Sequence, residues 1–336
     1  TYNMVISGAA GSTPYFTGMR IFQITITAPA GEMADLEYTP IPDQYYAGKE
    51  ITPTLTIKKG DYTLQLDKDY VIKSITGNTE VGVATVEIEG TGSYSGTKSL
   101  EFNIVPKPIE DCTITGIEDT QYEMGAAIEP AVTVKNGTVE LVQGRDYTLA
   151  FNNNTDASDS AEVVITAKSS NYTGDATKIF KITPVSITAS GNGVSITNAD
   201  ATQEYTGTDI EPEIKITRYY NRKNYTLEQG RDYTVVYKNN REVTGSGERA
   251  SITVTGIGNF SGQTVIRFEI SKRSISSCAV ESVPDQQWTG SEIKPDVAVY
   301  NGIIKLENGG DYDVIYSDNT DEGEASYTVI GKGDHY

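Results

Sequence analysis

The residues best suited to binding chemistry lie in one short segment rich in tyrosine and basic side chains. Tyrosine rings can stack on the faces of sugars, and Tyr and Arg are enriched at the centres of protein interfaces. Three positive charges so close together are unusual in a chain whose formal net charge is −19. The candidate ligand-binding residues are Arg218, Tyr219, Tyr220, Arg222, Lys223 and Tyr225. We expect a glycan or a protein ligand at this segment.

The same segment is longer than its counterparts elsewhere in the chain. An Ile–x–Pro motif precedes an Asp–Tyr pair four times, and the proline and the aspartate are 16 residues apart after Pro53, Pro130 and Pro295 but 20 apart after Pro212. The extra length predicts an extended hairpin tip, and a second insertion covers residues 241–248. A longer hairpin without a ligand is the alternative that the sequence leaves open.

No arrangement of residue types predicts catalysis. The chain has one histidine, His335, without a partner at a fixed spacing, whereas catalytic triads need a histidine held beside a nucleophile. Zinc sites need a cluster of three or four Cys, His or carboxylate ligands, and no phosphate-binding glycine loop follows a strand pattern. The 46 acidic residues do not single out a pair for glycoside hydrolysis. We therefore expect neither an enzyme nor a cofactor.

The acidic composition bears on metals and on partners. Residues 152–159 and 318–324 form acidic loops with several oxygen ligands for calcium, but they lack EF-hand spacing, so solvated turns are the simpler interpretation. The negative charge argues against nucleic acid, whose phosphates would be repelled, and against contact with an anionic membrane. No segment is apolar for long enough to predict a transmembrane helix.

Four signatures recur in the same order along the chain and identify an internal repeat. They are aromatic–x–Gly followed by Ile–x–Pro, an Asp–Tyr pair, a single Asn, and aromatic–Ser/Thr–Gly followed by Phe–x–Ile. The signature prolines are 77, 82 and 83 residues apart, a period that suits an independently folded sandwich domain. The Asp–Tyr pairs are Asp69-Tyr70, Asp146-Tyr147, Asp232-Tyr233 and Asp311-Tyr312, and the asparagines are Asn78, Asn154, Asn240 and Asn319.

Within one repeat the pattern predicts short strands separated by turns. In the second copy, residues 131–135 and 138–142 alternate on either side of Asn136-Gly137, a pair typical of a two-residue hairpin. No window has the apolar spacing of a helix. Seven strands per repeat predict an all-β fold of Ig-like sandwiches, with a β-grasp-like repeat as the alternative. The other expected strands cover residues 112–117, 121–123, 147–152, 162–167 and 177–182.

The signature residues have structural interpretations. Each Asp of an Asp–Tyr pair is expected to hold a turn by bonding nearby backbone, and each Tyr to point into the core. The Gly after the first aromatic is expected at positive φ. Because each feature occurs once per repeat, we interpret it as something that each repeat needs in order to fold.

The order of these motifs resembles the tandem Ig-like, glycine-rich and mostly-β repeats of bacterial cell-surface proteins and adhesins. The resemblance covers nearly the whole chain, with motif copies at Tyr46, Tyr122, Tyr205 and Trp288. It implies an extracellular location, at the bacterial surface or secreted, and a structural stalk or spacer that supports cell adhesion. The alternative is an adhesive module that binds a host or cell-surface glycan or protein through the inserted hairpin.

The repeats also predict the domain organisation. Residues 1–27 are expected to be a partial repeat that holds two last strands. Short connectors, two of them with proline, predict stiff links and an elongated rod. The Ig-like repeats are residues 28–105 (repeat 1), 106–183 (repeat 2), 184–271 (repeat 3) and 272–336 (repeat 4, expected to be truncated).

Two expectations concern the cysteines and repeat 4. Cys112 and Cys278 lie 166 residues apart with repeat 3 between them, and a disulfide needs Cα atoms within about 7 Å; we expect unpaired core thiols. Residues 272–336 lack the Phe–x–Ile motif, which predicts an open strand edge that invites strand addition. Residues 18–26 have the pattern of the added strand, so head-to-tail self-association is one expected outcome, and a hairpin against repeat 1 is the other.

Overall fold

The computed structural model describes residues 2–7, 19–24, 30–188, 191–197, 200–245 and 248–336. This described part consists of β-strands, turns and three short 3-10 helices, without an α-helix. The predicted all-β fold is confirmed, and the β-grasp-like alternative, which needs a helix across its sheet, is wrong for these residues. The chain divides into two compact units, and the division crosses repeat 2, so the repeat boundaries stay a prediction. The units are residues 1–117, 131–150 and 163–178, and residues 118–130, 151–162 and 179–336.

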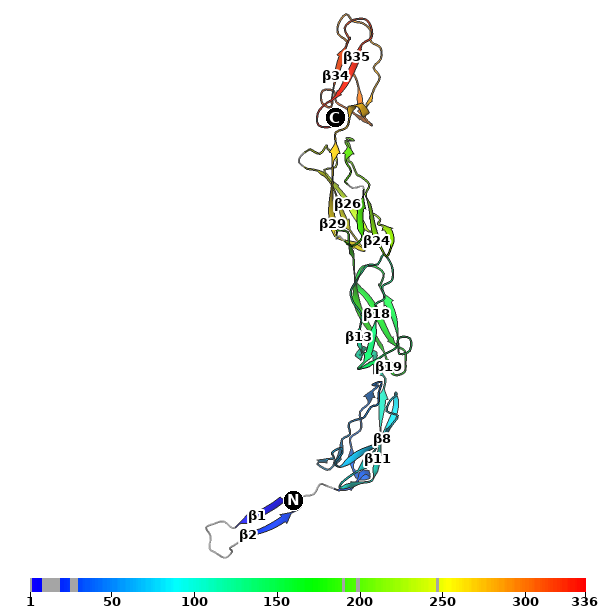
Figure 1. Ribbon diagram of the computed structural model, residues 1–336, viewed down its shortest axis with the longest axis vertical. Coiled ribbons are helices and arrows are strands. Elements are labelled where there is room, and N and C mark those ends of the chain that lie inside the picture. Colours follow the sequence, from blue (N-terminus) through cyan, green and yellow to red (C-terminus); the bar gives the residue numbers. More distant parts are fainter. Residues whose placement is uncertain (1, 8–18, 25–29, 189–190, 198–199, 246–247) are drawn as a thin grey trace. The chain divides into compact units, whose positions relative to one another are not determined.

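Repeat 1 is a sandwich of two sheets (Figure 1). One sheet has the order β4-β6-β7 and the other β5-β11-β9-β8, in which β11 pairs antiparallel with β9 and parallel with β5. Ile57 from the first sheet and Val86 and Ile88 from the second share one buried cluster, so the core lies between the sheets. The elements are β3 (Gly31–Glu32), η1 (Met33–Asp35), β4 (Glu37–Tyr38), β5 (Gln44–Tyr45), β6 (Ile57–Lys59), β7 (Tyr62–Thr63), β8 (Tyr70–Thr76), β9 (Gly82–Gly90), β10 (Tyr94–Ser95) and β11 (Thr97–Val105).

Repeat 2 contains the strands that the alternation predicts. The hairpin around Asn136-Gly137 forms between β15 and β16, and its turn needs a glycine, because Gly137 has φ 60°. The sheets have the orders β13-β15-β16 and β14-β20-β18-β17. The elements are β12 (Lys107–Pro108), η2 (Ile109–Asp111), β13 (Thr113–Thr115), β14 (Thr120–Gln121), β15 (Thr133–Asn136), β16 (Val139–Glu140), β17 (Tyr147–Asn152), β18 (Ser158–Ala167), β19 (Tyr172–Thr173) and β20 (Asp175–Thr183).

Repeat 3 has the same plan with a longer hairpin in its first sheet. The larger sheets have the orders β22-β24-β25 and β26-β27-β29, and β30 continues the last strand beside β23. Part of the second predicted insertion, residues 246–247, lies outside the described residues. The elements are β21 (Val185–Ser186), β22 (Val194–Thr197), β23 (Gln203–Glu204), β24 (Lys215–Tyr220), β25 (Lys223–Thr226), β26 (Tyr233–Lys238), β27 (Ala250–Gly256), β28 (Phe260–Ser261), β29 (Gln263–Phe268) and β30 (Ile270–Ser271).

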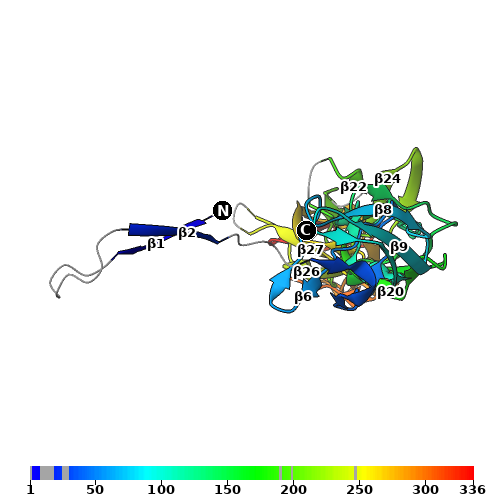
Figure 2. The same cartoon turned by 90° about the horizontal axis from the view of Figure 1, so that it is seen from below.

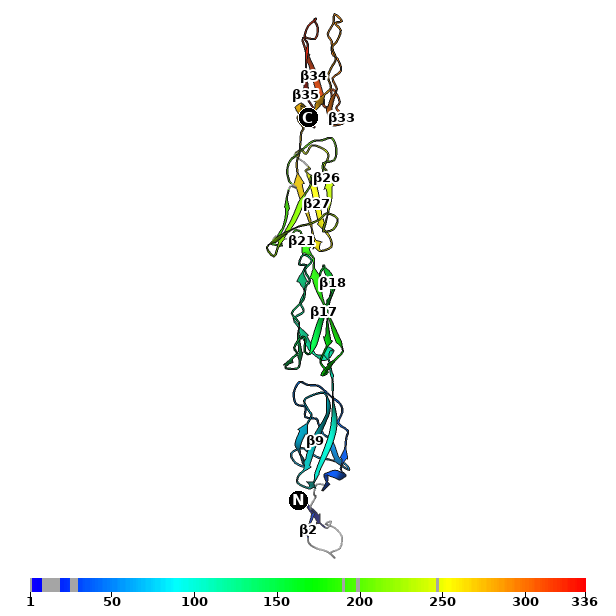
Figure 3. The ribbon, with the colours of Figure 1, turned by 90° about the vertical axis from the view of Figure 1, so that its right-hand side faces the viewer.

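Repeat 4 has fewer strands. Its sheets are β31-β32-β33 and β34-β35 (Figure 3), and within residues 272–336 no strand pairs with the second edge of β35. Near the start of the chain, β1 and β2 pair antiparallel (Figure 2), and residues 8–18 between them and 25–29 after them lie outside the described part. The elements are η3 (Ile275–Ser277), β31 (Ala279–Val280), β32 (Val299–Asn301), β33 (Ile304–Lys305), β34 (Tyr312–Ser317), β35 (Ser326–Gly331), β1 (Tyr2–Ser7) and β2 (Met19–Ile24).

The Asp–Tyr pairs do in each repeat what the sequence predicts. Each aspartate accepts a hydrogen bond from the backbone N–H four residues earlier and so closes the turn that leads into a strand. Each tyrosine is buried, between 2% and 4% exposed. The backbone donors to Asp69, Asp146, Asp232 and Asp311 are Gln65, Val142, Glu228 and Glu307, at 2.7–2.9 Å.

The signature asparagine pairs with the isoleucine of Ile–x–Pro, a contact that the sequence did not predict. In repeat 1, Asn78 Nδ2 donates to the Ile51 carbonyl at 3.0 Å, and the Ile51 N–H donates to the Asn78 carbonyl at 3.0 Å. The same two bonds join Ile128 with Asn154, Ile210 with Asn240, and Ile293 with Asn319. Two of the four signatures are thus halves of one structural element.

The cysteine prediction is confirmed. Cys112 and Cys278 are both free. Cys112 is buried, and its thiol pKa is raised by that burial. Cys278 is half-buried against the core of repeat 4, so it is less enclosed than a core residue was expected to be.

Candidate functional site

The inserted segment of repeat 3 forms the predicted hairpin. Strands β24 and β25 pair antiparallel up to Tyr220 and Lys223, and the two residues between them, Asn221 and Arg222, have φ 46° and 62°. Two consecutive residues at positive φ make the tight turn that matches the twist of a hairpin. Tyr219, Arg222 and Lys223 are exposed, so part of the predicted binding set lies on the surface.

The structure corrects the prediction for Arg218. Its side chain is only 2% exposed, so it does not belong to an exposed tip. Its Nη1 donates to the carbonyl oxygen of Tyr122 in repeat 2 at 2.9 Å, and its guanidinium lies 4.7 Å from the centre of the Tyr220 ring. Burial lowers the pKa of Arg218. A charge taken out of water in this way holds repeat 3 against repeat 2 and is not available to a ligand.

Tyr220 is drawn into the same contact. It is half-buried, and its pKa is raised first by burial and then by the charge of Glu123 in repeat 2. Tyr225, also half-buried, has the ammonium group of Lys223 over its ring at 4.8 Å. Of the six predicted ligand-binding residues, the structure therefore leaves Tyr219, Arg222 and Lys223 exposed and places the other three partly or wholly inside.

The buried arginine belongs to a joint between repeats 2 and 3. The Tyr122 ring packs edge-on against Phe260, with ring centres 5.9 Å apart. Asn259 Nδ2 donates to Asp156 at 2.9 Å, and the Ala157 N–H donates to Asn259 Oδ1 at 2.7 Å. Asp156 lies in the acidic loop considered for calcium, and here its carboxylate binds a side chain of the next repeat.

The joint between repeats 1 and 2 has the same three contacts. Asn136 Nδ2 donates to the Tyr46 carbonyl at 2.9 Å. The rings of Tyr46 and Tyr172 meet edge-on at 5.4 Å and 88°, and Asn171 Nδ2 donates to Glu80 at 2.8 Å. In both joints, one repeat presents a backbone carbonyl, an aromatic ring and a carboxylate. One side chain of the next repeat contacts each of these three groups.

Asn136 and Arg218 occupy equivalent positions in their repeats. Each follows, by two residues, a buried residue whose carbonyl accepts the N–H of the returning strand: Leu141 donates to Val134, and Leu227 to Ile216. The four-residue insertion thus lengthens the hairpin beyond a donor position that repeat 2 already uses. The sequence contained this signal, but the changed spacing hid it.

The joint between repeats 3 and 4 is a variation that includes the only histidine. His335 lies flat on the Tyr205 ring, with centres 4.3 Å apart and planes 9° apart, and its Nε2 lies 2.7 Å from a carboxylate oxygen of Glu242. Tyr336 meets Tyr205 edge-on at 5.8 Å. The sequence assigned His335 no partner, whereas it takes the place that Asn171 and Asn259 hold in the other joints.

The first-signature glycine contributes to the joints as well. Gly48 has φ 67°, as predicted for this position, and a Cβ there would lie 3.2 Å from both methyl groups of Val139 in the next repeat. A Cβ at Gly207 would lie 2.5 Å from Cδ1 of Ile304. At these two joints the glycine therefore allows close approach between repeats in addition to its turn, whereas a Cβ at Gly125 would meet no atom of the next repeat within 4 Å.

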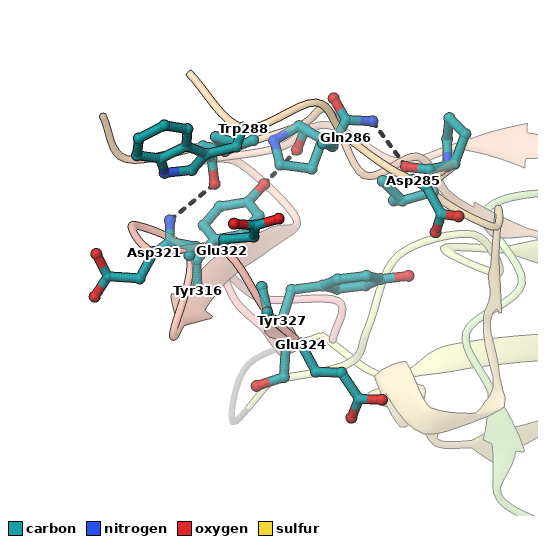
Figure 4. A pocket seen from close by; sticks show the side chains of 16 residues that line it. Asp285, Gln286, Trp288, Tyr316, Asp321, Glu322, Glu324 and Tyr327 are labelled. Atoms are coloured by element: carbon teal, nitrogen blue, oxygen red, sulfur yellow. Dashed lines mark hydrogen bonds between the residues drawn. The ribbon is translucent and has the colours of Figure 1, made fainter. Parts of the chain in front are cut away.

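A groove of about 560 Å³ opens in repeat 4. Figure 4 shows Gln286 and Trp288 on one segment and Glu324 and Tyr327 on the other. The Trp288 ring is 59% exposed, and its Nε1 donates to the Thr320 carbonyl at 3.2 Å.

Among the described residues, no three His, Cys, Asp or Glu side chains are grouped to hold a metal ion. None of the described segments is a helix long and apolar enough to cross a membrane.

Eight chains of solved structures are similar to this chain. No protein-family model matches the sequence, and no curated protein matches it. The chain is similar to domains 4–9 of the surface layer protein SbsC, at 14% identity over 74% of this chain and 49% of that one, with a TM-score of 0.18. It is also similar to the protocadherin GammaB4 extracellular domain, at 10% identity over 94% and 64% of the two chains, with a TM-score of 0.19. The chain thus spans about half the length of the first structure and less than two thirds of the second.

Proposed function

We propose that this chain is a structural segment of an extracellular bacterial surface protein, a spacer of tandem β-sandwiches that supports adhesion by a further part of the protein. The joints carry the proposal. The carbonyl, ring and carboxylate contacts between repeats 1 and 2 recur between repeats 2 and 3. A spacer needs direct contacts between neighbouring domains, and recurring contacts of this kind support the proposal. The proposal assigns no catalytic step and no cofactor to the chain.

The acidic surface fits the same function. A net charge of −19 keeps a protein with many exposed residues from associating non-specifically. The Asp–Tyr pairs and the Ile–Asn pairs lie within single repeats, and their contacts stabilise the fold of those repeats. The most regular features of the sequence are therefore structural, as a spacer requires.

A distance measurement between repeats tests the proposal. Spin labels on Val83→Cys in repeat 1 and Val236→Cys in repeat 3, both exposed positions, report the distance after Cys112 and Cys278 are replaced by Ala. We expect one narrow distance distribution. Adding Asn136→Ala and Arg218→Ala should broaden it. A distribution that is equally broad with and without these two changes would contradict the spacer function.

An adhesive module is the second candidate, favoured by one observation. Tyr219 is 56% exposed beside the exposed basic residues Arg222 and Lys223 on an acidic chain. In binding to glycan arrays or to cells, Tyr219→Ala with Arg222→Ala should then reduce binding by about tenfold or more. Val236→Ala, an exposed change elsewhere in repeat 3, is the control. Equal binding by the two variants would contradict the adhesive function, and only the spacer function would remain.

A further inference from the structure

Repeats 1, 2 and 3 join their opening strands to their closing strands in parallel. Repeat 1 pairs β3 with β10 and β5 with β11. Repeat 2 pairs β12 with β19 and β14 with β20, and repeat 3 pairs β21 with β28 and β23 with β30. The hairpins in between are antiparallel, such as β24 with β25 and β26 with β27. In each of these repeats we call the first parallel pair the entry pair and the second the exit pair.

The direction of these pairs decides how a repeat responds to tension. In a parallel pair the N-terminal ends of both strands lie side by side. The chain enters the repeat through the N-terminal end of an opening strand and leaves it through the C-terminal end of a closing strand. Tension between these two ends therefore pulls the paired strands in opposite directions along their axes. All hydrogen bonds of the pair then bear the load together, whereas a hairpin pulled from its two free ends loses one bond at a time.

The entry pair of repeat 3 shows which bonds bear this load. The Val185 N–H donates to the Asn259 carbonyl, and the Ile187 N–H donates to the Ser261 carbonyl, both at 2.9 Å. The side chains of Val185 and Ile187 are buried in the core, which anchors the opening strand. Because β28 is followed at once by β29 and β30, tension that crosses this pair runs along the closing strands to the end of the repeat.

The exit pair of repeat 3 repeats this arrangement closer to the end of the closing strand. The Gln203 N–H donates to the Glu269 carbonyl at 2.8 Å, and the Tyr205 N–H donates to the Ser271 carbonyl at 2.9 Å. The Ser271 hydroxyl adds a bond to the Gln203 carbonyl at 3.2 Å. Ile270 of β30 is 1% exposed, so this closing strand is anchored in the core as well. If the entry pair opens, the exit pair takes the load in the same direction.

Repeats 1 and 2 have corresponding bonds. In repeat 2 the Thr183 hydroxyl donates to the Thr120 carbonyl at 3.0 Å, as the Ser271 hydroxyl does to the Gln203 carbonyl in repeat 3. The load-bearing pairs therefore belong to the common plan of these three repeats. The corresponding N–H to carbonyl bonds, at 2.9–3.3 Å, join Gly31 to Ser93, Tyr46 to Val105, Lys107 to Asn171 and Tyr122 to Thr183.

We propose that repeats 1, 2 and 3 are load-bearing units, which transmit tension from the opening strands to the closing strands and leave their hairpins unloaded. In repeat 3, tension that crosses from β23 to β30 bypasses the chain between β23 and β28, including the inserted hairpin. Such a unit is useful where a chain holds another part of the protein under pull, so this role rests on the proposed spacer function. The unfolding force of one repeat is nevertheless measured independently of the distance distribution that tests the spacer.

The first experiment changes the direction of tension and leaves the fold of repeat 3 as it is. Single-molecule force measurements use the whole chain with Cys112 and Cys278 replaced by Ala. Handles on Ala201→Cys and Ser274→Cys, both exposed positions, shear the exit pair. Moving the first handle to the exposed Thr206→Cys, just after β23, opens the same pair from one end. We expect the unfolding force to fall by roughly twofold or more, because forced unfolding is governed by the unfolding barrier. Equal forces in the two directions would overturn the proposal.

Two variants with the handles at positions 201 and 274 separate mechanical from thermal stability. Gln203→Pro removes the N–H that donates to the Glu269 carbonyl, at the first residue of β23, where a strand tolerates proline. Asn240→Ala, the matched control, removes a bond to the Ile210 carbonyl in the bypassed part. Both should lower the melting temperature, but only Gln203→Pro should lower the unfolding force. An unchanged force in Gln203→Pro, or an equal loss of force in both variants, would contradict a load path through the exit pair. Circular dichroism checks the fold of each variant, and the change of handle depends on neither.

Discussion

The joint between repeats 1 and 2 and the joint between repeats 2 and 3 use different side-chain donors to the same backbone acceptor. Both present a tyrosine carbonyl to the next repeat, and both pack that tyrosine edge-on against an aromatic ring. The first carbonyl receives the neutral amide of Asn136, the second the buried guanidinium of Arg218. The second joint also gains the Tyr220 ring beside the cation.

The difference teaches how to interpret an insertion. A longer hairpin with aromatic and basic residues has the composition of a binding loop, yet two of its six candidate residues, Arg218 and Tyr220, face the neighbouring repeat. Only the outward side chains, such as Tyr219 and Arg222, are available to a ligand. A hairpin that is longer in one repeat than in the others indicates a different contact. In this chain, the partner in that contact is the adjacent repeat.

Removing the charged donor should have the largest effect. Arg218→Ala leaves the Tyr122 carbonyl without its donor, and a hydrogen bond to a charged group contributes about 1.5–3 kcal/mol. The free energy of opening at the joint should fall by about that amount. Hydrogen exchange of the Ala157 amide, which bonds Asn259 across the joint, measures it. Arg222→Ala at the exposed tip is the control, and equal protection in both variants would contradict the role of Arg218.

Removing the neutral donor should cost less. Asn136→Ala deletes one uncharged bond to the Tyr46 carbonyl, worth about 1 kcal/mol. Hydrogen exchange of the Lys107 amide, which donates to the Asn171 carbonyl beside the joint, should become several-fold faster, since the joint opens more often. Lys135→Ala, one residue away from Asn136 on the same strand, should leave the exchange rate of this amide unchanged. If Asn136→Ala costs as much as Arg218→Ala, the comparison between the joints fails.

Acid should destabilise repeats 2 and 3 through an Arg–Asp pair that each of them contains. The Arg145 hydrogen bond holds the pKa of Asp146 below its usual value, and Arg231 contacts Asp232 in the same way beside the second joint. A depressed carboxyl pKa stabilises the fold above about pH 4, the unfolded value, and the contribution is lost as pH falls through the folded pKa. Arg145→Ala should move the acid-unfolding midpoint of repeat 2 to higher pH. An unchanged midpoint in circular dichroism would contradict this.

The smallest effect is expected at the third joint. His335→Asn restores the residue that the other joints use and can keep a hydrogen bond to Glu242. We expect a change within about 0.5 kcal/mol, the size of a surface substitution. His335→Ala removes both that bond and the stacking on Tyr205 and should cost more. Hydrogen exchange of the Arg273 amide, which donates to the His335 carbonyl, compares the two variants. An equal loss of protection in both would mean that the contact with the Glu242 carboxylate does not stabilise the joint.

Alternation and turn chemistry predict most of the fold, and they predict less of the joints. The strands of repeat 2, the Asn136-Gly137 turn and the buried Tyr147 follow from local pattern, because their causes lie within a few residues. The three-residue helix Ile109–Asp111 was missed, since it is too short to leave a period. The role of Tyr46 was missed for a different reason. A residue that recurs once per repeat looks the same in sequence whether its partner lies in its own repeat or in the next.

The same carbonyl contact has a consequence for how such a gene can change. Tyr46 and Tyr122 offer a backbone oxygen, which every amino acid possesses, and the following repeat brings its own donor in Asn136 or Arg218. Half of this bond is therefore independent of side-chain identity. If recombination duplicates or removes one whole repeat, the new neighbours still present an acceptor and a donor to each other. The array can gain or lose length in a single genetic step without a compensating mutation at the seam.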